Sequence, residues 1–153
     1  MTAVEALQRA PLFKDFTETG LRIFAAIAQE KALPAGSPLF VENMVGESLF
    51  IVKTGTVRIT QKTADGEREL SLLGAGEHLG ELSLLARSVR LVSAVAATQC
   101  EVLEIAQRDF ALLQPQKPQA CLKLALAIAS ELATKVADSR ELLREILPKK
   151  SAP

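Results

Sequence analysis

The strongest structural signal in this chain is the sequence LFIVKTGTVRITQKTADGERELSL at residues 49–72. Residues 49–52 form a continuous apolar run, and Val57 and Ile59 alternate with polar neighbours, as residues of β-strands do. Asp65 and Gly66 form the two-residue sequence that favours a tight hairpin turn. The stretch therefore predicts antiparallel strands connected by a hairpin.

Short apolar runs and turns continue on both sides of this stretch, from residue 33 to residue 105. Glycines mark the turns, at positions 36, 46, 55, 66, 74 and 76. Many short strands separated by turn residues are typical of an antiparallel β-roll or jelly roll. We place this β-roll at residues 33–107.

Helical patterns flank the predicted β-roll. Residues 2–9 and 17–29 have apolar residues at helical spacing, and Thr17 is a candidate N-cap. A short helix is expected after Asp109, a second candidate cap, and a long helix after Pro118. The sequence therefore predicts one α+β domain, mainly β, over residues 1–153. Its parts are N-terminal helices at 1–32, the β-roll at 33–107, C-terminal helices at 108–147 and a tail at 148–153.

The long C-terminal helix carries a heptad pattern. Its members are three or four residues apart, at Leu122, Ala125, Ala129, Leu132, Val136, Ser139, Leu143 and Ile146. Such a pattern is typical of a helix that pairs with its own copy. For residues 122–132, packing against the β-roll of the same chain is an equal alternative, whereas for residues 136–146 we favour a partner. A homodimer through the 122–146 helix is therefore one prediction.

Composition limits the classes of function. The 153 residues suffice for one domain with a core, and 18 basic residues balance 18 acidic ones, so no overall charge attracts nucleic acid or an anionic membrane. His78 is the only histidine, so no Ser/His/Asp, Cys/His or His-rich metal site can be built without it, which removes most enzyme classes. We expect His78 in a loop or at a strand end, half exposed. We expect no enzyme and no metal.

The chain start and the cysteines indicate the compartment. The first residues, MTAVEALQRAPLF, contain no basic segment that leads into an apolar run, so we expect no secretory signal and a cytoplasmic location. Apolar runs are too short for a membrane span. Cys100 and Cys121 are expected to be reduced and buried or half buried.

Several features of an anion site coincide in the sequence LGELSLLARSVRLVS, residues 79–93. Gly80 permits a close backbone approach, and the run that follows it favours a short helix. The amides of the first helical turn, near Leu82 and Ser83, lack helical partners and would attract an anion. Arg90 can contact two oxygens of the same anion with its planar guanidinium.

Glu81 adds a second requirement, because a carboxylate repels an anion and can only accept hydrogen bonds. It must therefore face a donor. A ligand with one phosphodiester charge and one nearby sugar hydroxyl satisfies both Glu81 and Arg90, and cyclic nucleotides have this layout. The alternative is an ion pair of Glu81 with Arg87 or Arg90 across a turn.

Four segments of the chain have the sequence of a known module. They are APLF at residues 10–13, LPAGSPLFVENMVGESLFIVKTGTVRI at 33–59, ADGE at 64–67 and LGAGEHLGELSLL at 73–85. With these segments, and an arginine ten residues after Gly80, the chain resembles the cyclic-nucleotide-binding domain from about Pro11 to Leu143. This domain is the β-roll module of the catabolite-activator and protein-kinase-A regulatory families.

The resemblance implies roles for individual residues. In that family an arginine, here Arg90, and two backbone amides, here those of Ser83 and Leu91, hold the cyclic phosphate. The family's glutamate, here Glu81, takes the ribose 2'-hydroxyl. Ser93 stands where related domains often carry a hydroxyl residue that reaches guanine, so both cAMP and cGMP are candidates. The expected ligand-binding residues are Gly80, Glu81, Leu82, Ser83, Arg90, Leu91 and Ser93.

The chain departs from the family pattern close to these residues. Val89 replaces the usual proline, and Leu91 and Val92 replace small residues, so larger side chains would narrow the pocket. Asn43 replaces a common glycine, but asparagine tolerates a left-handed backbone.

The resemblance also concerns the C-terminal helix, which in this family commonly caps the base. Thr134 and Lys135 are candidates for this contact, and an ordinary solvated helix face is the alternative. Transcription factors of the family continue into a helix-turn-helix, whereas only PKKSAP follows Leu147 here, so we expect no DNA binding.

The sequence leads to three hypotheses. The first is a cytoplasmic regulatory sensor that binds cAMP or cGMP, lacks an effector domain of its own and signals to an unidentified effector protein. The second is a β-roll that has lost its ligand and acts as a dimerisation or docking module. The third is a binder of a cyclic dinucleotide. We expect no cofactor, no nucleic acid and no membrane among the partners.

Overall fold

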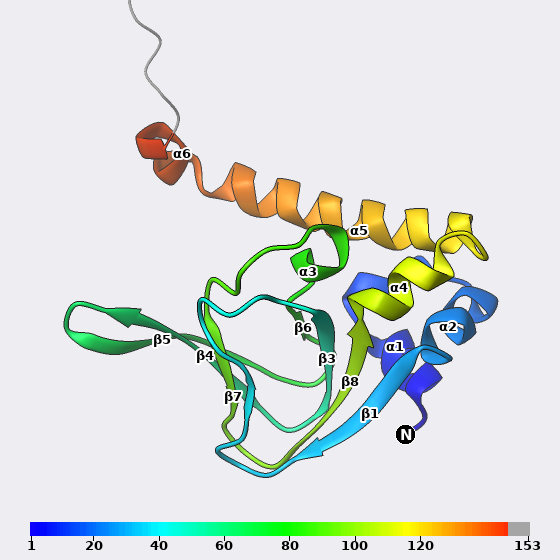
Figure 1. Ribbon diagram of the computed structural model, residues 1–153, viewed down its shortest axis with the longest axis horizontal. Helices are drawn as coiled ribbons and strands as arrows, with labels where there is room; N and C mark the ends of the chain where they lie inside the picture. Colours follow the sequence, from blue (N-terminus) through cyan, green and yellow to red (C-terminus); the bar gives the residue numbers. More distant parts are fainter. Residues whose placement is uncertain (147–153) are drawn as a thin grey trace, which may run out of the picture.

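The computed structural model describes residues 1–146, and the predicted tail at 148–153 lies outside them. Its centre consists of two four-stranded antiparallel sheets, in the orders β1-β8-β3-β6 and β2-β7-β4-β5. The predicted α+β fold with a mainly β core is therefore confirmed (Figure 1). The strands are β1 (Ala28–Leu33), β2 (Pro38–Phe40), β3 (Ser48–Thr54), β4 (Val57–Thr63), β5 (Gly66–Leu73), β6 (His78–Leu79), β7 (Ser93–Ala96) and β8 (Cys100–Ala106).

The predicted hairpin is formed by β4 and β5. Its register runs from Val57 opposite Leu73 to Thr63 opposite Gly66, and the turn lies at Ala64 and Asp65. The hairpin extends beyond the rest of the roll in Figure 1.

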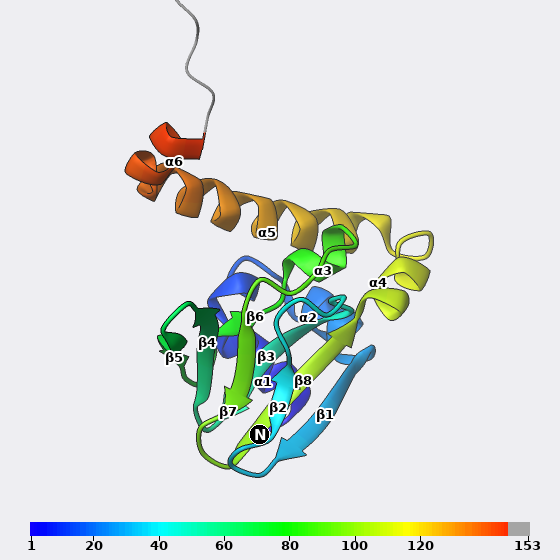
Figure 2. The ribbon, with the colours of Figure 1, turned by 60° about the vertical axis from the view of Figure 1, so that its left-hand side comes forward.

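Helices cover one end of the roll. They are α1 (Ala3–Arg9), η1 (Pro11–Phe13), α2 (Glu18–Ala25), α3 (Leu82–Leu85), α4 (Gln107–Leu113), α5 (Pro118–Asp138) and α6 (Arg140–Ile146). In Figures 1 and 2, α5 runs across this end with α3 lying between it and the sheets. The helix after Pro118 is thus placed over the predicted ligand segment.

Both faces of β3 are buried, which explains its continuous apolar sequence. Leu49 and Ile51 point into a cluster formed with the helices, whereas Phe50 and Val52 point into a cluster inside the roll. A strand that is buried on both faces needs no polar alternation. β3 therefore separates the two hydrophobic clusters of the domain.

The predicted helix at 17–29 is correct at its start and wrong at its end. Thr17 caps it by accepting a hydrogen bond from Gly20 N at 3.2 Å, but α2 ends at Ala25. Residues 28–33 instead form β1, which pairs with β8 from Ala28 opposite Ile105 onward. Pairing with a distant strand outweighs the local helical pattern, so the roll begins at residue 28 rather than 33.

Two predictions for the C-terminal helices need correction. α4 begins at Gln107, so Asp109 lies in its first turn and is not its cap. The long helix ends at Asp138 rather than near Leu147, which lies outside the described residues. At the break, Ser139 N donates to Val136 O at 3.1 Å and Ser139 Oγ donates to Lys135 O at 2.9 Å. These bonds replace the helical pattern and separate α5 from α6.

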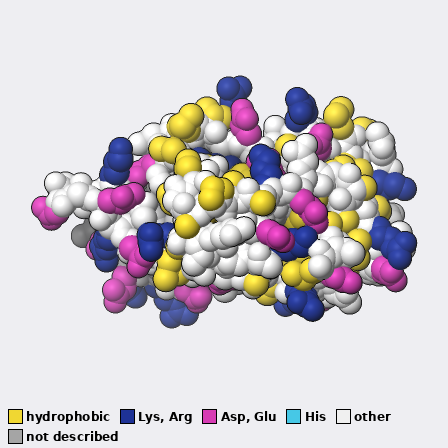
Figure 3. All heavy atoms as spheres, turned by 90° about the horizontal axis from the view of Figure 1, so that it is seen from below, with side chains coloured by type: hydrophobic (Ala, Val, Ile, Leu, Met, Phe, Trp, Pro, Cys, Tyr) yellow, Lys and Arg dark blue, Asp and Glu magenta, His cyan; other side chains and the backbone are white. Residues whose placement is uncertain are grey.

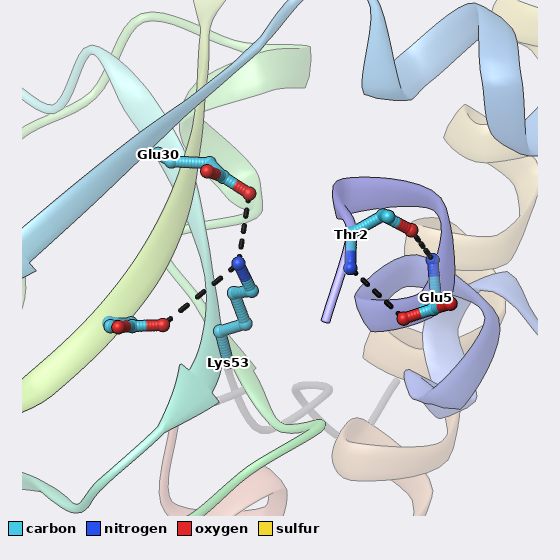
Figure 4. A network of polar contacts seen from close by, with 5 residues as sticks. Thr2, Glu5, Glu30 and Lys53 are labelled. Atoms are coloured by element: carbon cyan, nitrogen blue, oxygen red, sulfur yellow. Dashed lines mark hydrogen bonds and ion pairs between the residues drawn. The ribbon is translucent and has the colours of Figure 1, made fainter.

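Two separate groups of polar contacts are shown in Figure 4, one at the start of α1 and one between strands of the first sheet. Thr2 and Glu5 form a capping box, with hydrogen bonds of 3.1 and 3.0 Å that start α1. Lys53 on β3 is almost buried, and its ammonium lies 2.9 Å from Glu30 and 3.9 Å from Glu101. The aliphatic stem of Lys53 is therefore packed while its charge is paired at the surface.

Charges of both signs are interspersed on the face opposite α5 (Figure 3). This pattern agrees with the net charge of zero, because no single-sign patch dominates that face. None of the helices that the structure describes is long and apolar enough to cross a membrane.

Candidate functional site

The site is built around Arg90, whose backbone is fixed by a neighbouring loop. Arg90 N donates to Met44 O at 2.7 Å, and Asn43 N donates to Arg90 O at 2.8 Å. Asn43 has the left-handed backbone that was expected of it, with φ of 72°. The loop before β3 thus holds the segment after α3 in place.

The guanidinium of Arg90 is buried, with the residue only 6% exposed. It donates to Ser48 O at 2.8 Å, to Ser83 Oγ at 3.0 Å and to Gly80 O at 3.4 Å. Its central carbon lies 4.1 Å from the ring centroid of Phe40. Sequence analysis identified Arg90 but missed Ser48 and Phe40, because a main-chain acceptor and an aromatic contact leave no spacing signal.

Two glycines leave room for this guanidinium. A Cβ on Gly46 would lie 2.9 Å from Arg90 Nε, and a Cβ on Gly80 would overlap the guanidinium and lie 2.7 Å from Ser48 O. Gly80 also has φ of 78°, in the left-handed region that other residues rarely adopt. Gly80 therefore shapes the site through both its backbone and its lack of a side chain.

The charge of Arg90 is only partly compensated. Burial lowers the pKa of Arg90, and the carboxylates of Glu104, Glu81 and Glu47 oppose this shift. Arginine keeps its proton in proteins, so a positive charge lies below the surface here. No ion pair among the described residues includes Arg90, and its buried Nε has no hydrogen-bond acceptor.

Glu81 lies directly before α3 and faces α5. Its carboxylate is 3.6 Å from the ammonium of Lys135, and its side chain is 16% exposed. The alternative ion pair with Arg87 or Arg90 is therefore not formed within the described residues. Glu81 contacts a donor, as its chemistry requires, but this donor comes from the C-terminal helix.

The remaining expected ligand residues differ in their contacts and in their exposure. Leu82 begins α3, and Ser83 N already donates to Gly80 O at 3.1 Å. Ser93 Oγ on β7 accepts from Glu42 N at 2.9 Å. Leu91 is 68% exposed, so its side chain lies in solvent rather than inside the segment. Their roles toward a ligand stay predictions.

The side chains of Val89 and Val92, which depart from the family pattern, lie in different surroundings. Val89 forms an isolated bridge with Val45 and is exposed. Val92 packs against the cluster inside the roll. The side chains of Val89 and Leu91, which are larger than the family's usual residues, thus extend into solvent, whereas that of Val92 packs in the core.

Sequence analysis missed a polar cluster that joins α5 to the roll. His78 Nε2 on β6 lies 2.8 Å from Glu131 Oε2 on α5, and Lys135 Nζ lies 2.9 Å from Glu131 Oε1. The side chain of His78 is 12% exposed, which is less than expected for a strand-end histidine. Thr134 Oγ1 donates back to Ser130 O at 3.2 Å, within its own helix. Lys135 is thus part of a network, not an isolated solvated side chain.

The same cluster contains potential metal ligands. One ligand atom each from His78, Glu81 and Glu131 lies within 4.8 Å of the others. The ammonium of Lys135 contacts both carboxylates and supplies a positive charge there. Both carboxylates are therefore paired with a charge of the chain itself, whereas Nε2 of His78 is buried and makes no hydrogen bond to any described residue despite its proximity to Glu131.

Comparisons with known proteins agree with this geometry. Residues 30–114 match the family model described as cyclic nucleotide-binding domain. The chain is 33% identical to the Cyclic AMP receptor protein of Thermus thermophilus over 127 residues, covering 82% of this chain and 59% of the relative. The chain thus spans less than two thirds of that relative.

Solved structures show the same likeness. The N-terminal domain of a transcriptional regulator from Streptomyces coelicolor has a TM-score of 0.78 and 30% identity, covering 88% of this chain and 96% of that domain. A cyclic nucleotide-binding-like protein from Brucella abortus has a TM-score of 0.65 and 32% identity, covering 74% of this chain and 97% of that one.

Proposed function

The chain belongs to the cyclic nucleotide-binding domain family, and from this membership we propose that it binds a cyclic nucleotide at Arg90 and Glu81. The observation that carries the proposal is the buried guanidinium of Arg90, which no carboxylate of the described residues pairs directly. Burying an unpaired charge costs free energy. A phosphodiester anion that contacts this guanidinium supplies the counter-charge.

The groups around Arg90 match one phosphodiester and one hydroxyl. The guanidinium has five N–H groups, and Nε–H is buried without an acceptor. Nη1 donates to Ser83 Oγ and to Gly80 O, and these bonds hold the guanidinium beside the start of α3, next to Glu81. Glu81 accepts the ribose 2'-hydroxyl in the proposed complex, while Gly80, Leu82, Ser83 and Leu91 approach the phosphate and Ser93 the base.

Calorimetric titration with cAMP and with cGMP tests this proposal. Arg90→Ala removes a set of charged hydrogen bonds worth about 1.5–3 kcal/mol, so affinity falls roughly tenfold to 150-fold. Arg87→Ala is the matched control, because Arg87 is an exposed arginine in the same segment. Its affinity stays at the wild-type value.

Circular dichroism of each variant checks that Arg90→Ala remains folded, since Arg90 is a buried residue. Equal binding by folded Arg90→Ala and wild type contradicts the proposal. If the protein binds neither cAMP nor cGMP but binds a cyclic dinucleotide, the site is assigned to the cyclic dinucleotide. The single guanidinium of Arg90 favours the mononucleotide, which carries one phosphodiester charge.

A specific surface favours a second property, homodimerisation through α5. The buried residues of α5 are Cys121, Leu124 and Ile128, which face the roll, so the heptad stripe is turned outward. Within it Leu122, Leu132 and Val136 are 59%, 41% and 43% exposed. An exposed apolar stripe at heptad spacing supports pairing with a second copy. The side chains of Leu143 and Ile146 lie outside the described residues.

The proposed role is regulatory rather than enzymatic. The domain acts in the cytoplasm as a sensor, and the position of α5 carries the signal to an effector protein. A partner that prefers the ligand-bound form must raise the ligand affinity by the same factor, because coupling is reciprocal. A ligand-free docking module is the competing role, and the titration separates the two.

A further inference from the structure

The second half of α5 is held to the roll by charge rather than by apolar packing. The last buried apolar residue of α5 is Ile128, and residues 132–138 are exposed. Among the described residues, Glu131 lies against His78 on β6 and Lys135 against Glu81 directly before α3. These contacts decide whether residues 131–138 stay against the roll.

The ammonium of Lys135 lies near two carboxylates, one on α5 and one on the roll. Its Nζ lies 2.9 Å from Glu131 on its own helix and 3.6 Å from Glu81 on the roll. Partial burial lowers the pKa of Lys135, but the hydrogen bond to Glu131 and the charges of both carboxylates outweigh this, so the pKa lies above its ordinary value. The ammonium is therefore charged at neutral pH.

The contact with Glu81 is the weaker of the two and the one a ligand can replace. A distance of 3.6 Å is an ion pair without a short hydrogen bond, and the Lys135 side chain is 60% exposed. A ligand hydroxyl that donates to Glu81 must approach the same carboxylate. Lys135 keeps its shorter contact with Glu131 when this happens.

We propose that Lys135 competes with the ligand for Glu81, and so lowers ligand affinity while it fastens α5 to the roll. The proposal rests on the cyclic nucleotide function above and adds its regulation. Ligand binding exchanges the Lys135 contact for the ligand hydroxyl and leaves Glu131 and His78 as the tie between α5 and the roll. Site occupancy is thereby linked to the position of residues 131–138.

Two variants test the competition, because it predicts that one raises the ligand affinity and the other lowers it. Lys135→Gln removes the competing charge, so cyclic nucleotide affinity rises by about two- to fivefold, the range of an exposed ion pair. Glu131→Gln removes the shorter partner of Lys135, which then pairs more fully with Glu81, so affinity falls. Lys123→Gln is the matched control, because Lys123 lies on α5 but contacts Asp15 O and the ring of Phe16.

A ligand-free measurement tests the tie itself. Lys135→Gln and Glu81→Gln each speed amide hydrogen exchange at residues 131–138 by about two- to fivefold. The double variant exchanges no faster than Lys135→Gln alone, because Lys135→Gln already removes the contact with Glu81 together with the contact with Glu131. Lys123→Gln leaves exchange at these residues unchanged.

The outcomes separate this inference from the proposed function. Wild-type binding that Arg90→Ala removes, together with unchanged or weaker binding by Lys135→Gln, overturns the competition alone. Weaker binding would mean that Lys135 contacts the ligand directly. Failure of the wild type to bind any cyclic nucleotide overturns the proposed function and the competition with it, and additive exchange rates in the double variant overturn the tie.

Discussion

Arg90 shows how small residues decide where a charged side chain lies. The guanidinium fits between β3 and α3 because positions 46 and 80 have no Cβ. The hydrogen bonds to Ser48 and Ser83 then fix its orientation. In the proposed complex, an arginine that is positioned in advance loses less conformational entropy on binding than a mobile one.

Gly80→Ala should destabilise the protein and disturb the site together. Alanine at position 80 would have to adopt a left-handed backbone, and its Cβ would overlap the Arg90 guanidinium. The free energy of unfolding therefore falls by about 1–3 kcal/mol. Gly74→Ala is the control, because nothing lies within 4 Å of its Cβ and its backbone is not left-handed. Urea denaturation of both variants measures the difference, and equal stabilities would contradict this account of Gly80.

At the residue scale, the sequence predicted Glu81 and Arg90 as site residues but not the residues that each of them contacts. Gly80, Glu81 and Arg90 lie within one short segment, so their spacing is visible in the sequence. His78 and Glu131 come from β6 and α5, and no local pattern connects them. Lys135 was considered only for the base, because its contact with Glu81 depends on how α5 crosses α3.

At the scale of elements, α5 combines two faces with different partners. One face carries Cys121, Leu124 and Ile128 and packs on the roll, and the heptad stripe lies on another. The sequence left open whether residues 122–132 pack on the roll or on a partner. In the structure this part of the helix packs on the roll through Cys121, Leu124 and Ile128, which are not stripe residues. The stripe therefore stays exposed.

Replacing Leu132 and Val136 together by glutamine should weaken the proposed dimer by at least about tenfold in dissociation constant, since two apolar side chains leave the interface. Glutamine keeps the helix propensity high. Leu126→Gln is the control, because Leu126 is an exposed apolar residue of α5 outside the heptad stripe, where it lines a pocket with Pro11 and Leu12 of η1. Sedimentation over a concentration series measures the effect. A wild type that is monomeric throughout the series would refute pairing through α5.

Element boundaries were predicted less well than element types. The hairpin of β4 and β5 was predicted because its turn signal, Asp65-Gly66, is local, although the turn itself lies one residue earlier, at Ala64 and Asp65. The end of α2 and the start of β1 depend on pairing with β8, and the break at Ser139 depends on two hydrogen bonds that a heptad pattern does not reveal.

At the scale of the molecule, the two hydrophobic clusters each contain one free cysteine. Cys121 belongs to the cluster between helices and roll, and Cys100 to the cluster inside the roll. Burial raises the pKa of the Cys121 thiol, which reduces its reactive thiolate form. Thiol labelling therefore reports the opening of each cluster separately.

Cys121 should be modified at least about tenfold faster than Cys100. Detachment of α5 exposes Cys121 without opening the sheets, so we expect it to cost at least about 1.4 kcal/mol less free energy than the opening that exposes Cys100. The variants Cys100→Ser and Cys121→Ser isolate the two thiols, and mass spectrometry of alkylated native protein gives the rates. Equal rates would show that the two clusters open as one unit.

The first cluster also joins segments that are far apart in synthesis. Leu7 and Phe13 are buried in the same cluster as Leu124 and Ile128. During translation the N-terminal helices therefore leave the ribosome long before their packing partners exist, and their apolar faces stay uncovered while the roll emerges. Contacts between distant segments also slow the folding search. Aggregation during synthesis is therefore expected to involve the apolar faces of α1 and α2, which stay uncovered until α5 has been made.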